Sequence, residues 1–166
     1  MKKIDELLSV MEQWVGKEER IPPCEVEKGT MMRIPWAVGD PNPLWRDEAY
    51  ARKTRYGGLI ASPYFVEWLR FRIRSSYGRA PRPVTRDLPQ DLPGEPENIV
   101  GGEEVEYFQP IRPGDTIHIT SRTIDVKKRW SGKLGKDVAI QTRQESYRNQ
   151  FGELVATIKC INIKSF

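Results

Sequence analysis

Apolar side chains early in the chain recur at intervals of three and four residues, which is the spacing of amphipathic helices. The clearest run covers residues 3–15 and ends at Gly16, so it predicts one N-terminal helix. The same pattern then predicts an extended segment at 20–26 and two short helices at 31–38 and 46–53.

The most apolar helical pattern covers about residues 62–77. On a helical wheel its apolar side chains span roughly 200°, whereas a helix that rests on a core by one stripe needs about 100°. A clearly polar side is left only to Glu67, Arg70 and Arg74. This pattern predicts a long central helix that is wrapped by other structure.

From residue 99 onward, alternating apolar and polar positions predict β-strands. The four expected strands are 99–108, 116–127, 138–148 and 154–164. In the second of these the apolar alternation changes phase after Ile119, so we expect a β-bulge between Ser121 and Thr123.

Residues 78–98 contain five prolines and cannot form regular structure of any length. We expect a long surface loop, and structureless stretches of about twenty residues in compact domains often border a binding site. The whole chain, 1–166, is then expected to be a single α+β domain in which a curved antiparallel sheet wraps the long central helix.

Composition fits one folded domain and excludes several classes of protein. With 166 residues, 38% of them hydrophobic and 30% charged, the chain can bury a sizeable core. No apolar run reaches the ~20 residues of a membrane span, and the acidic, amphipathic start is no signal peptide. We therefore expect a cytoplasmic protein without a membrane partner. Cys24 and Cys160 lack CxxC spacing and a nearby histidine cluster, which predicts core thiols and no metal site.

The excess of positive charge comes largely from one stretch. The formal net charge is +4, but Lys and Arg are mixed with Asp and Glu along most of the chain, so we expect no nucleic-acid partner. Within seventeen residues that contain no acid lie Arg70, Arg72, Arg74, Arg79, Arg82 and Arg86. This concentration suits the phosphates of a small molecule. A polynucleotide, or a solvated helix face followed by a basic loop, remains the alternative.

The stretch richest in candidate chemistry is 38–50. Pro41 and Pro43 push the residues before them toward extended geometry, which places Asp40 and Asn42 in a rigid polar turn. Such a turn can aim a carboxylate and a carboxamide at a water or a carbonyl group. The structural alternative is an Asx-type turn that links two helical segments.

Two further positions have a chemical interpretation. Gly57 and Gly58 precede the predicted central helix, where free backbone N–H groups can bind an anion or a polarised carbonyl, although turn formation is the simpler explanation. His118, the only histidine of the chain, is expected to be a surface residue of a strand and not a base.

Several of these stretches resemble one family. Residues 39–44, Gly-Asp-Pro-Asn-Pro-Leu, resemble the Gly-Asp-x-Asn-Pro-Leu-His signature of the MaoC-like (R)-specific enoyl-CoA hydratases and dehydratases, which have a hot-dog fold. Residues 57–62 resemble the start of that family's central helix. Residues 114–117 and 147–153 resemble a strand start and the terminal hairpin of its N-terminal-type dehydratase branch. The resemblance implies a single hot-dog fold over the whole chain.

The resemblance also implies roles for individual residues. Asp40 and Asn42 match catalytic positions, and the backbone N–H of Gly58 matches the group that stabilises the enolate oxygen of the thioester. An acyl-CoA thioester is the implied substrate, and coenzyme A is part of that substrate, so no separate cofactor is expected. The expected substrate-binding residues are Trp45, Gly57, Tyr64, Arg79 and Arg82, the two arginines on the basis of their charge alone.

One position departs from the family pattern. Trp45 stands where the family has its histidine, and an indole has one N–H donor and no basic site. In the family an aspartate and a histidine hold one water between them and add it across the α,β double bond. The departure therefore argues against activity of the isolated chain.

Three interpretations follow from this departure. The preferred one is a subunit of an acyl-CoA hydratase or dehydratase, paired with a second MaoC-like hot-dog chain that supplies the Asp-His dyad. The second is a self-sufficient dimer that uses Asp40 as a hydratase or a thioesterase. The third, from another class, is a non-catalytic module that binds acyl-CoA.

Overall fold

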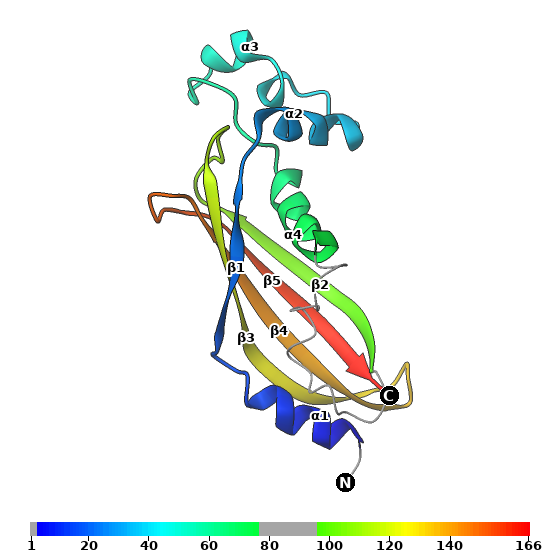
Figure 1. Cartoon of the computed structure of the whole chain (residues 1–166). Helices are drawn as coiled ribbons and strands as arrows, with labels where there is room; N and C mark the ends of the chain where they lie inside the picture. The colour runs from blue at the N-terminus through cyan, green and yellow to red at the C-terminus, as the bar shows by residue number, and fades with distance from the viewer. Residues whose placement is uncertain (1–2, 77–95) are drawn as a thin grey trace.

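The computed structural model describes residues 3–76 and 96–166, which form a curved antiparallel sheet with helices against it (Figure 1). In chain order the elements are α1 (Lys3–Glu12), β1 (Glu18–Glu25), α2 (Lys28–Ala37), the 3-10 helix η1 (Pro43–Trp45), α3 (Glu48–Arg52), α4 (Tyr64–Ser76), β2 (Glu97–Tyr107), β3 (Thr116–Ser131), β4 (Lys136–Arg148) and β5 (Leu154–Ser165). The sheet has the order β1-β3-β4-β5-β2, and all neighbours are antiparallel. The predicted α+β fold class is confirmed.

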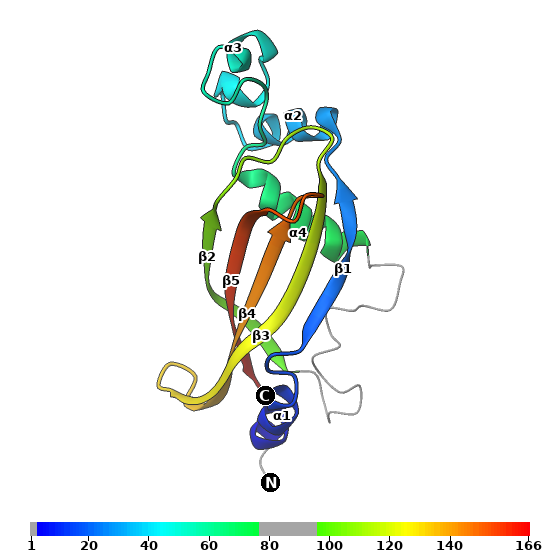
Figure 2. The ribbon, with the colours of Figure 1, turned by 90° about the vertical axis from the view of Figure 1, so that its left-hand side faces the viewer.

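The helix α4 lies against one face of the sheet (Figures 1 and 2). Its side chains Phe65, Val66 and Leu69 are buried, at spacings of one and three residues that share one side of a helix. They belong to a core that also includes Ile117 and Ile119 of β3, Tyr147 of β4, and Val155, Ala156 and Ile158 of β5. Each buried side chain of this size stabilises the fold by about 1.5–3 kcal/mol, so this face anchors the domain.

A second, smaller core lies under α1 at the other end of the sheet. It joins Leu7 and Met11 of α1 to Ala139 of β4. Ala139 and Tyr147 are eight residues apart in an unbroken stretch of the β4–β5 ladder, so they point to the same face of the sheet. The helices α1 and α4 therefore cover opposite ends of one face.

The two edges of the sheet differ. At one edge β1 pairs with β3, and its register shifts between Ile21 and Cys24, where Pro22 and Pro23 lie. Prolines and register shifts hinder further strand pairing. At the other edge β2 runs for 11 residues without a proline, and its register with β5 also shifts once, between Val100 and Gly102. Among the described residues the outer side of β2 pairs with no strand, so that edge is open to another one.

The helix α4 is less enclosed than its sequence pattern predicts. Phe71, placed in the predicted apolar arc, is 68% exposed, and Tyr64 is 50% exposed. Arg70, predicted to be polar and solvated, is buried. The reason is that the sheet covers one side of α4, and Arg70 follows Val66 by four residues, so both share the covered side.

The ends of several elements also differ from the prediction. The helix α1 ends at Glu12, because Gln13 and Trp14 continue as a turn with bonds to the carbonyls three residues before them. The helix α4 begins two residues after the predicted start, at Tyr64. Strand β2 begins at Glu97, inside the predicted loop, and residues 77–95 of the expected helix end and loop lie outside the described residues.

The predicted bulge in β3 exists, but it lies further along the strand. The register with β4 shifts between Thr123 and Asp125, not between Ser121 and Thr123. Ser121 and Thr123 continue the alternation of core-facing positions, but with polar side chains. They can be buried because Ser121 Oγ accepts from Arg143 at 2.9 Å and Thr123 Oγ1 accepts from Gln141 at 2.9 Å. A hydrophobic pattern misses inward positions that are polar.

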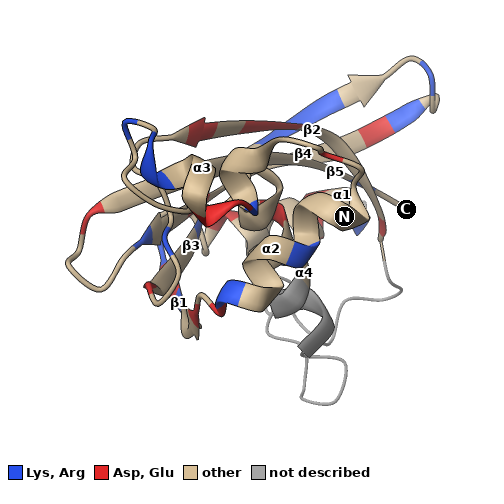
Figure 3. Cartoon of the chain, turned by 90° about the horizontal axis from the view of Figure 1, so that it is seen from above, with Lys and Arg blue, Asp and Glu red and all other residues tan. Residues whose placement is uncertain are grey.

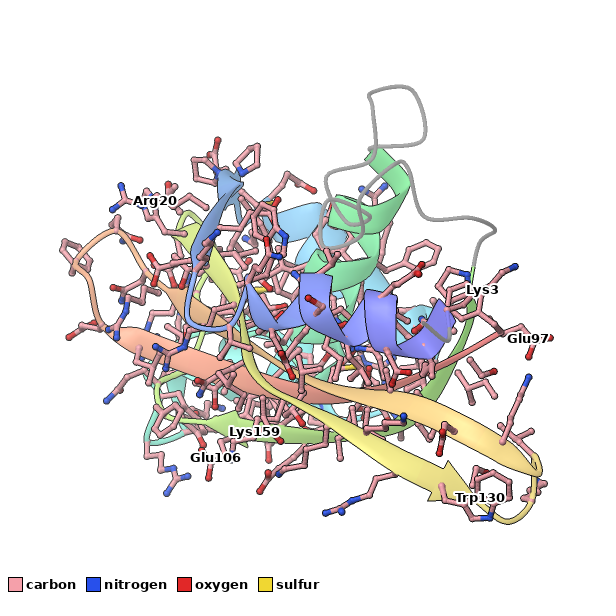
Figure 4. The ribbon with its side chains drawn as sticks, turned by 90° about the horizontal axis from the view of Figure 1, so that it is seen from below. Lys3, Arg20, Glu97, Glu106, Trp130 and Lys159 are labelled. Atoms are coloured by element: carbon pink, nitrogen blue, oxygen red, sulfur yellow. The ribbon has the colours of Figure 1, made fainter. Side chains whose placement is uncertain are left out.

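Two short elements pack beyond the end of the sheet. Seen from above, α2 and α3 lie in front of it (Figure 3). At the opposite end the β3–β4 hairpin projects, with Trp130 at its outer end (Figure 4) and 67% exposed. None of the helices in the described ranges has the length and apolar character needed to cross a membrane.

Candidate active site

The candidate site is carried by the segment between β1 and α4. Glu27 caps α2, and its carboxylate accepts from the backbone N–H groups of Gly29 and Thr30. Hydrogen bonds from Thr30 and Gly29 lower the pKa of this carboxyl. This cap explains why α2 begins at Lys28, three residues before the predicted helix. The helix ends before Gly39, whose φ of +72° turns the chain toward Asp40.

In the turn after α2, two of the predicted catalytic side chains accept hydrogen bonds from backbone N–H groups. Asp40 Oδ1 accepts from the N–H of Asn42 at 3.0 Å. Asn42 Oδ1 accepts from the N–H of Leu44 at 3.0 Å and so caps η1. The Asx-type turn named as the structural alternative is therefore present, and it leads into η1. The helix predicted at 46–53 is present as the shorter α3.

The second oxygen of the Asp40 carboxylate is bound by an indole. Trp45 Nε1 donates to Asp40 Oδ2 at 2.8 Å, and both side chains are half-buried. Position 45 thus lies where a neighbouring base would meet the carboxylate, but it holds a group that can only donate. His118 is no substitute, because it is an exposed residue of β3 between the buried Ile117 and Ile119.

Gly57 and Gly58 lie apart from the helix that they were expected to open. The first residue of α4 is Tyr64, so the Gly58 N–H is outside its first turn. Gly57 has a φ of +67°, which a turn requires and glycine readily adopts. Gly58 lines a shallow pocket of about 150 Å³ together with Lys28, Glu48, Arg52, Leu59 and Pro113. Its role as an oxyanion donor stays a prediction.

The start of α4 offers fewer free N–H groups than an ordinary helix. Pro63 has none, and the Phe65 N–H donates to the carbonyl of Ser62 at 2.9 Å. Tyr107 donates from its hydroxyl to the Pro63 carbonyl at 3.0 Å, and burial, with Glu67 as a smaller cause, raises the pKa of that phenol. Tyr64 is beside this contact, and its predicted role in substrate binding stays a prediction.

Arg70, one of the six clustered arginines, is not available to a ligand. Its side chain is 5% exposed, and its guanidinium bonds to Glu103 and lies 3.5 Å from a carboxylate oxygen of Glu145. Burial alone would lower the pKa of Arg70, but the charge of Glu145 and the bond to Glu103 outweigh it and raise that pKa. The predicted phosphate contacts Arg79 and Arg82 lie outside the described residues, as does Arg86.

The sequence pattern did not lead us to predict this buried ionic cluster, although the positions of two acidic residues in the strands indicate it. Glu103 pairs with Cys160 across the β2–β5 ladder, and Glu145 pairs with Ile158, so both carboxylates take inward positions. The Tyr147 hydroxyl donates to Glu145 at 2.7 Å. Acidic residues at inward positions of predicted strands would have indicated a buried cation between them.

The chain is similar to known proteins over most of its length. A family model described as "FAS1-like, dehydratase domain region" matches residues 13–158. A UPF0336 protein of Streptomyces avermitilis is 32% identical over 135 residues, which is 81% of each chain. A UPF0336 protein of Streptomyces griseus is 31% identical over 136 residues, 82% of this chain and 81% of that one.

Solved structures share the fold at lower identity. The ChsH1-ChsH2 complex of Mycobacterium tuberculosis matches with a TM-score of 0.75 and 19% identity over 98% of this chain and 92% of that one. The HadBC (3R-hydroxyacyl-ACP dehydratase) complex of the same organism has a TM-score of 0.67 and 20% identity, with coverage of 90% and 96%. The MaoC-like dehydratase of Rhodospirillum rubrum has a TM-score of 0.66 and 24% identity, with coverage of 91% and 92%. The fold is thus that of the MaoC-like hot-dog proteins.

Proposed function

The chain belongs to the FAS1-like dehydratase-region family, and from this premise we propose that it is one subunit of an enzyme that hydrates an enoyl thioester or catalyses the reverse dehydration. Its partner is a second hot-dog chain that supplies the acid–base pair. The substrate is an acyl thioester of coenzyme A or of a carrier that presents the same arm.

The observation that carries this proposal is the pair of hydrogen bonds that the Asp40 carboxylate accepts. One carboxylate oxygen accepts from the Asn42 backbone and the other from the Trp45 indole. Addition of water to an enoyl thioester needs a group that takes a proton from the water and a group that returns one to carbon. In the described part of the chain an indole, and not a basic side chain, meets Asp40, so we infer that half of that machinery comes from the partner.

The open edge of the sheet supports a partner of the same fold. Among the described strands β2 pairs on one side only, with β5, and it carries the exposed apolar residues Ile99 and Val100. On α4, Phe71 is also exposed. A second hot-dog chain can pair with this edge and cover the apolar residues, which favours association. Heteromeric structures of this fold, such as the ChsH1-ChsH2 complex, are consistent with this arrangement.

In such a complex this chain contributes structural support and part of the surface that contacts the acyl chain. The turn at Asp40 and Asn42 holds α2 against η1, and Trp45 and Tyr64 present aromatic surface for an acyl chain. Asp40 is kept as an acceptor that fixes the indole of Trp45. Its carboxylate does not take part in proton transfer.

The test is co-expression with a hot-dog protein encoded beside this chain, followed by an assay of the purified complex on a short enoyl thioester. We expect hydration by the complex and none by this chain alone. Replacing the partner's histidine should abolish activity, and Asp40→Asn in this chain should leave most of it. Hydration by the isolated chain, lost in Asp40→Asn, would establish the self-sufficient enzyme instead. Thioester binding without turnover by any complex would favour the non-catalytic module.

A further inference from the structure

The outer edge of the sheet carries negative charge that the proposed reaction does not use. Strand β2 holds four glutamates and no lysine or arginine, and these acidic positions are red along the strand in Figure 3. Val105 packs against the core beneath α4, so its neighbours Glu104 and Glu106 point to the opposite face of the sheet. Both are exposed. The composition of this edge bears on which partner can pair with it.

Nearby cations neutralise only part of this charge. Glu103 points inward and bonds to the buried Arg70, so its charge is compensated within the chain. Glu104 Oε2 lies 3.4 Å from Lys159 Nζ, but this is an exposed ion pair, and such pairs contribute little. In the described part of the chain Glu106 forms no ion pair within 4.0 Å. The outward side of β2 therefore keeps an excess of carboxylates.

The acidic residues occupy the regular part of the edge. The register of β2 with β5 shifts between Val100 and Gly102, and from Gly102 to Tyr107 it runs without a further shift. A strand that extends the sheet meets evenly placed backbone donors and acceptors on this second segment. It also brings its own side chains to within about 5 Å of Glu104 and Glu106, measured between Cβ atoms. The charges on the incoming strand therefore affect the stability of the pair.

A second copy of this chain is a poor partner for that segment. In a two-fold antiparallel pair of identical strands, facing residues point to the same face of the sheet, which permits pairings centred on Glu103, Glu104, Val105 or Glu106. Three of these place a glutamate opposite its own copy, and the pairing centred on Val105 places Glu104 opposite Glu106. Like charges directly opposite each other destabilise a strand pair, and no position of β2 offers a cation to relieve them.

We infer that β2 selects its partner by charge, so that the second hot-dog chain pairs with it through an edge strand that carries Lys or Arg opposite Glu104 and Glu106. The inference rests on the proposed function, in which that second chain supplies the acid–base pair. The exposed Ile99 and Val100 give any pair apolar area to bury, so they favour association without choosing the partner. The glutamates make the choice, because they stabilise a pair with a basic strand and destabilise a pair with a second copy.

Assembly with the hot-dog chain encoded beside this one is measured by calorimetric titration of the two full chains, without substrate. Glu104→Gln together with Glu106→Gln should weaken binding about tenfold at low salt, and this loss should shrink as salt screens the charges. The matched control, Glu18→Gln with Glu25→Gln, removes the same charge from exposed positions of β1 at the other edge and should leave the affinity unchanged. Equal affinities of the parent and the β2 variant at low salt would overturn the inference.

The chain alone gives a second test in sedimentation velocity, because the two kinds of pairing depend on salt in opposite ways. Binding to a basic partner should weaken as salt rises, whereas self-association of the parent should be weak at low salt and increase with salt. Glu104→Gln with Glu106→Gln should self-associate more than the parent at low salt, and the β1 control should not. A β2 variant that associates no more than the parent would show that these glutamates do not exclude a second copy.

These measurements separate the inference from the proposed function, because neither of them uses turnover. A complex that depends on Glu104 and Glu106 but does not hydrate an enoyl thioester would refute the proposed function and leave the charge-selected interface in place. A complex that hydrates the thioester and assembles equally well with both glutamates replaced would refute the interface and leave the proposed function.

Discussion

The indole Nε1 of Trp45 lies 2.8 Å from Oδ2 of Asp40 and donates a hydrogen bond to it. The two residues are five positions apart in the sequence. A bond from a neutral donor to an ionised acceptor contributes about 1.5 kcal/mol or more when solvent is partly excluded. We expect Trp45→Phe to lower the free energy of unfolding by about that amount in urea titrations. Trp36→Phe is the control, because Trp36 is 69% exposed, and a loss of similar size there would contradict the prediction.

Trp45→His should place an imidazole beside Asp40. The carboxylate favours the protonated ring, so its pKa should rise above the usual value of about 6.5. Because the folded-state pKa is raised, this contact should stabilise the protein below about pH 6.5 and lose that effect as pH rises through the shifted value. NMR titration of the introduced ring measures this directly, and the same variant with Asp40→Asn is the control. An equal pKa of the introduced ring with and without the Asp40 carboxylate would show that the ring does not meet Asp40.

The buried charge of Arg70 should be costly to remove. Arg70→Leu leaves Glu103 and Glu145 under α4 without their cation, and breaking a buried pair from one side costs about 3 kcal/mol or more. Arg52→Leu, whose side chain is 71% exposed, should change the free energy of unfolding by less than about 0.5 kcal/mol. Equal stabilities of the two variants would mean that the cluster is not structural.

Tyr147 should make stability fall at alkaline pH. Burial, and then the charge of Glu145, raise the pKa of this phenol, so the folded chain keeps a proton that the unfolded chain releases near pH 10. Stability therefore declines above about pH 10. Tyr147→Phe should be less stable than the parent at pH 8, and the gap should narrow as pH rises. A gap between Tyr147→Phe and the parent that stays constant as pH rises would refute the assignment.

The open β2 edge should be needed for assembly with the second hot-dog chain. Val100→Lys places a charge on this edge, where Val100 is 53% exposed in the single chain, and we expect it to weaken the co-purified complex in light scattering. Phe151→Lys is the matched control, because Phe151 is 78% exposed on the β4–β5 turn, away from that edge. An intact complex with Val100→Lys would place the interface elsewhere.

Much of the fold could be predicted because it depends on near neighbours in the sequence. Periods of three to four and of two residues identify helices and strands, and α4 and β5 begin within two residues of their expected starts. The polar turn at Asp40 also follows from local chemistry, because two prolines restrict the backbone around it. The family signature in the same residues pointed to a hydratase with an altered acid–base pair.

Only the tertiary structure decided which side chains meet. Arg70 seemed solvated until the sheet placed Glu103 and Glu145 over it, and a hydrophobic pattern cannot report a buried position that holds a charge. The pocket beside Gly58 joins Lys28, Arg52 and Pro113, which are far apart in the sequence. By itself the sequence determined that position 45 holds no base. The hydrogen bond from its indole to the Asp40 carboxylate depends on the path of the chain between the two residues. A hydrogen bond is set by distance in space and not by distance along the sequence.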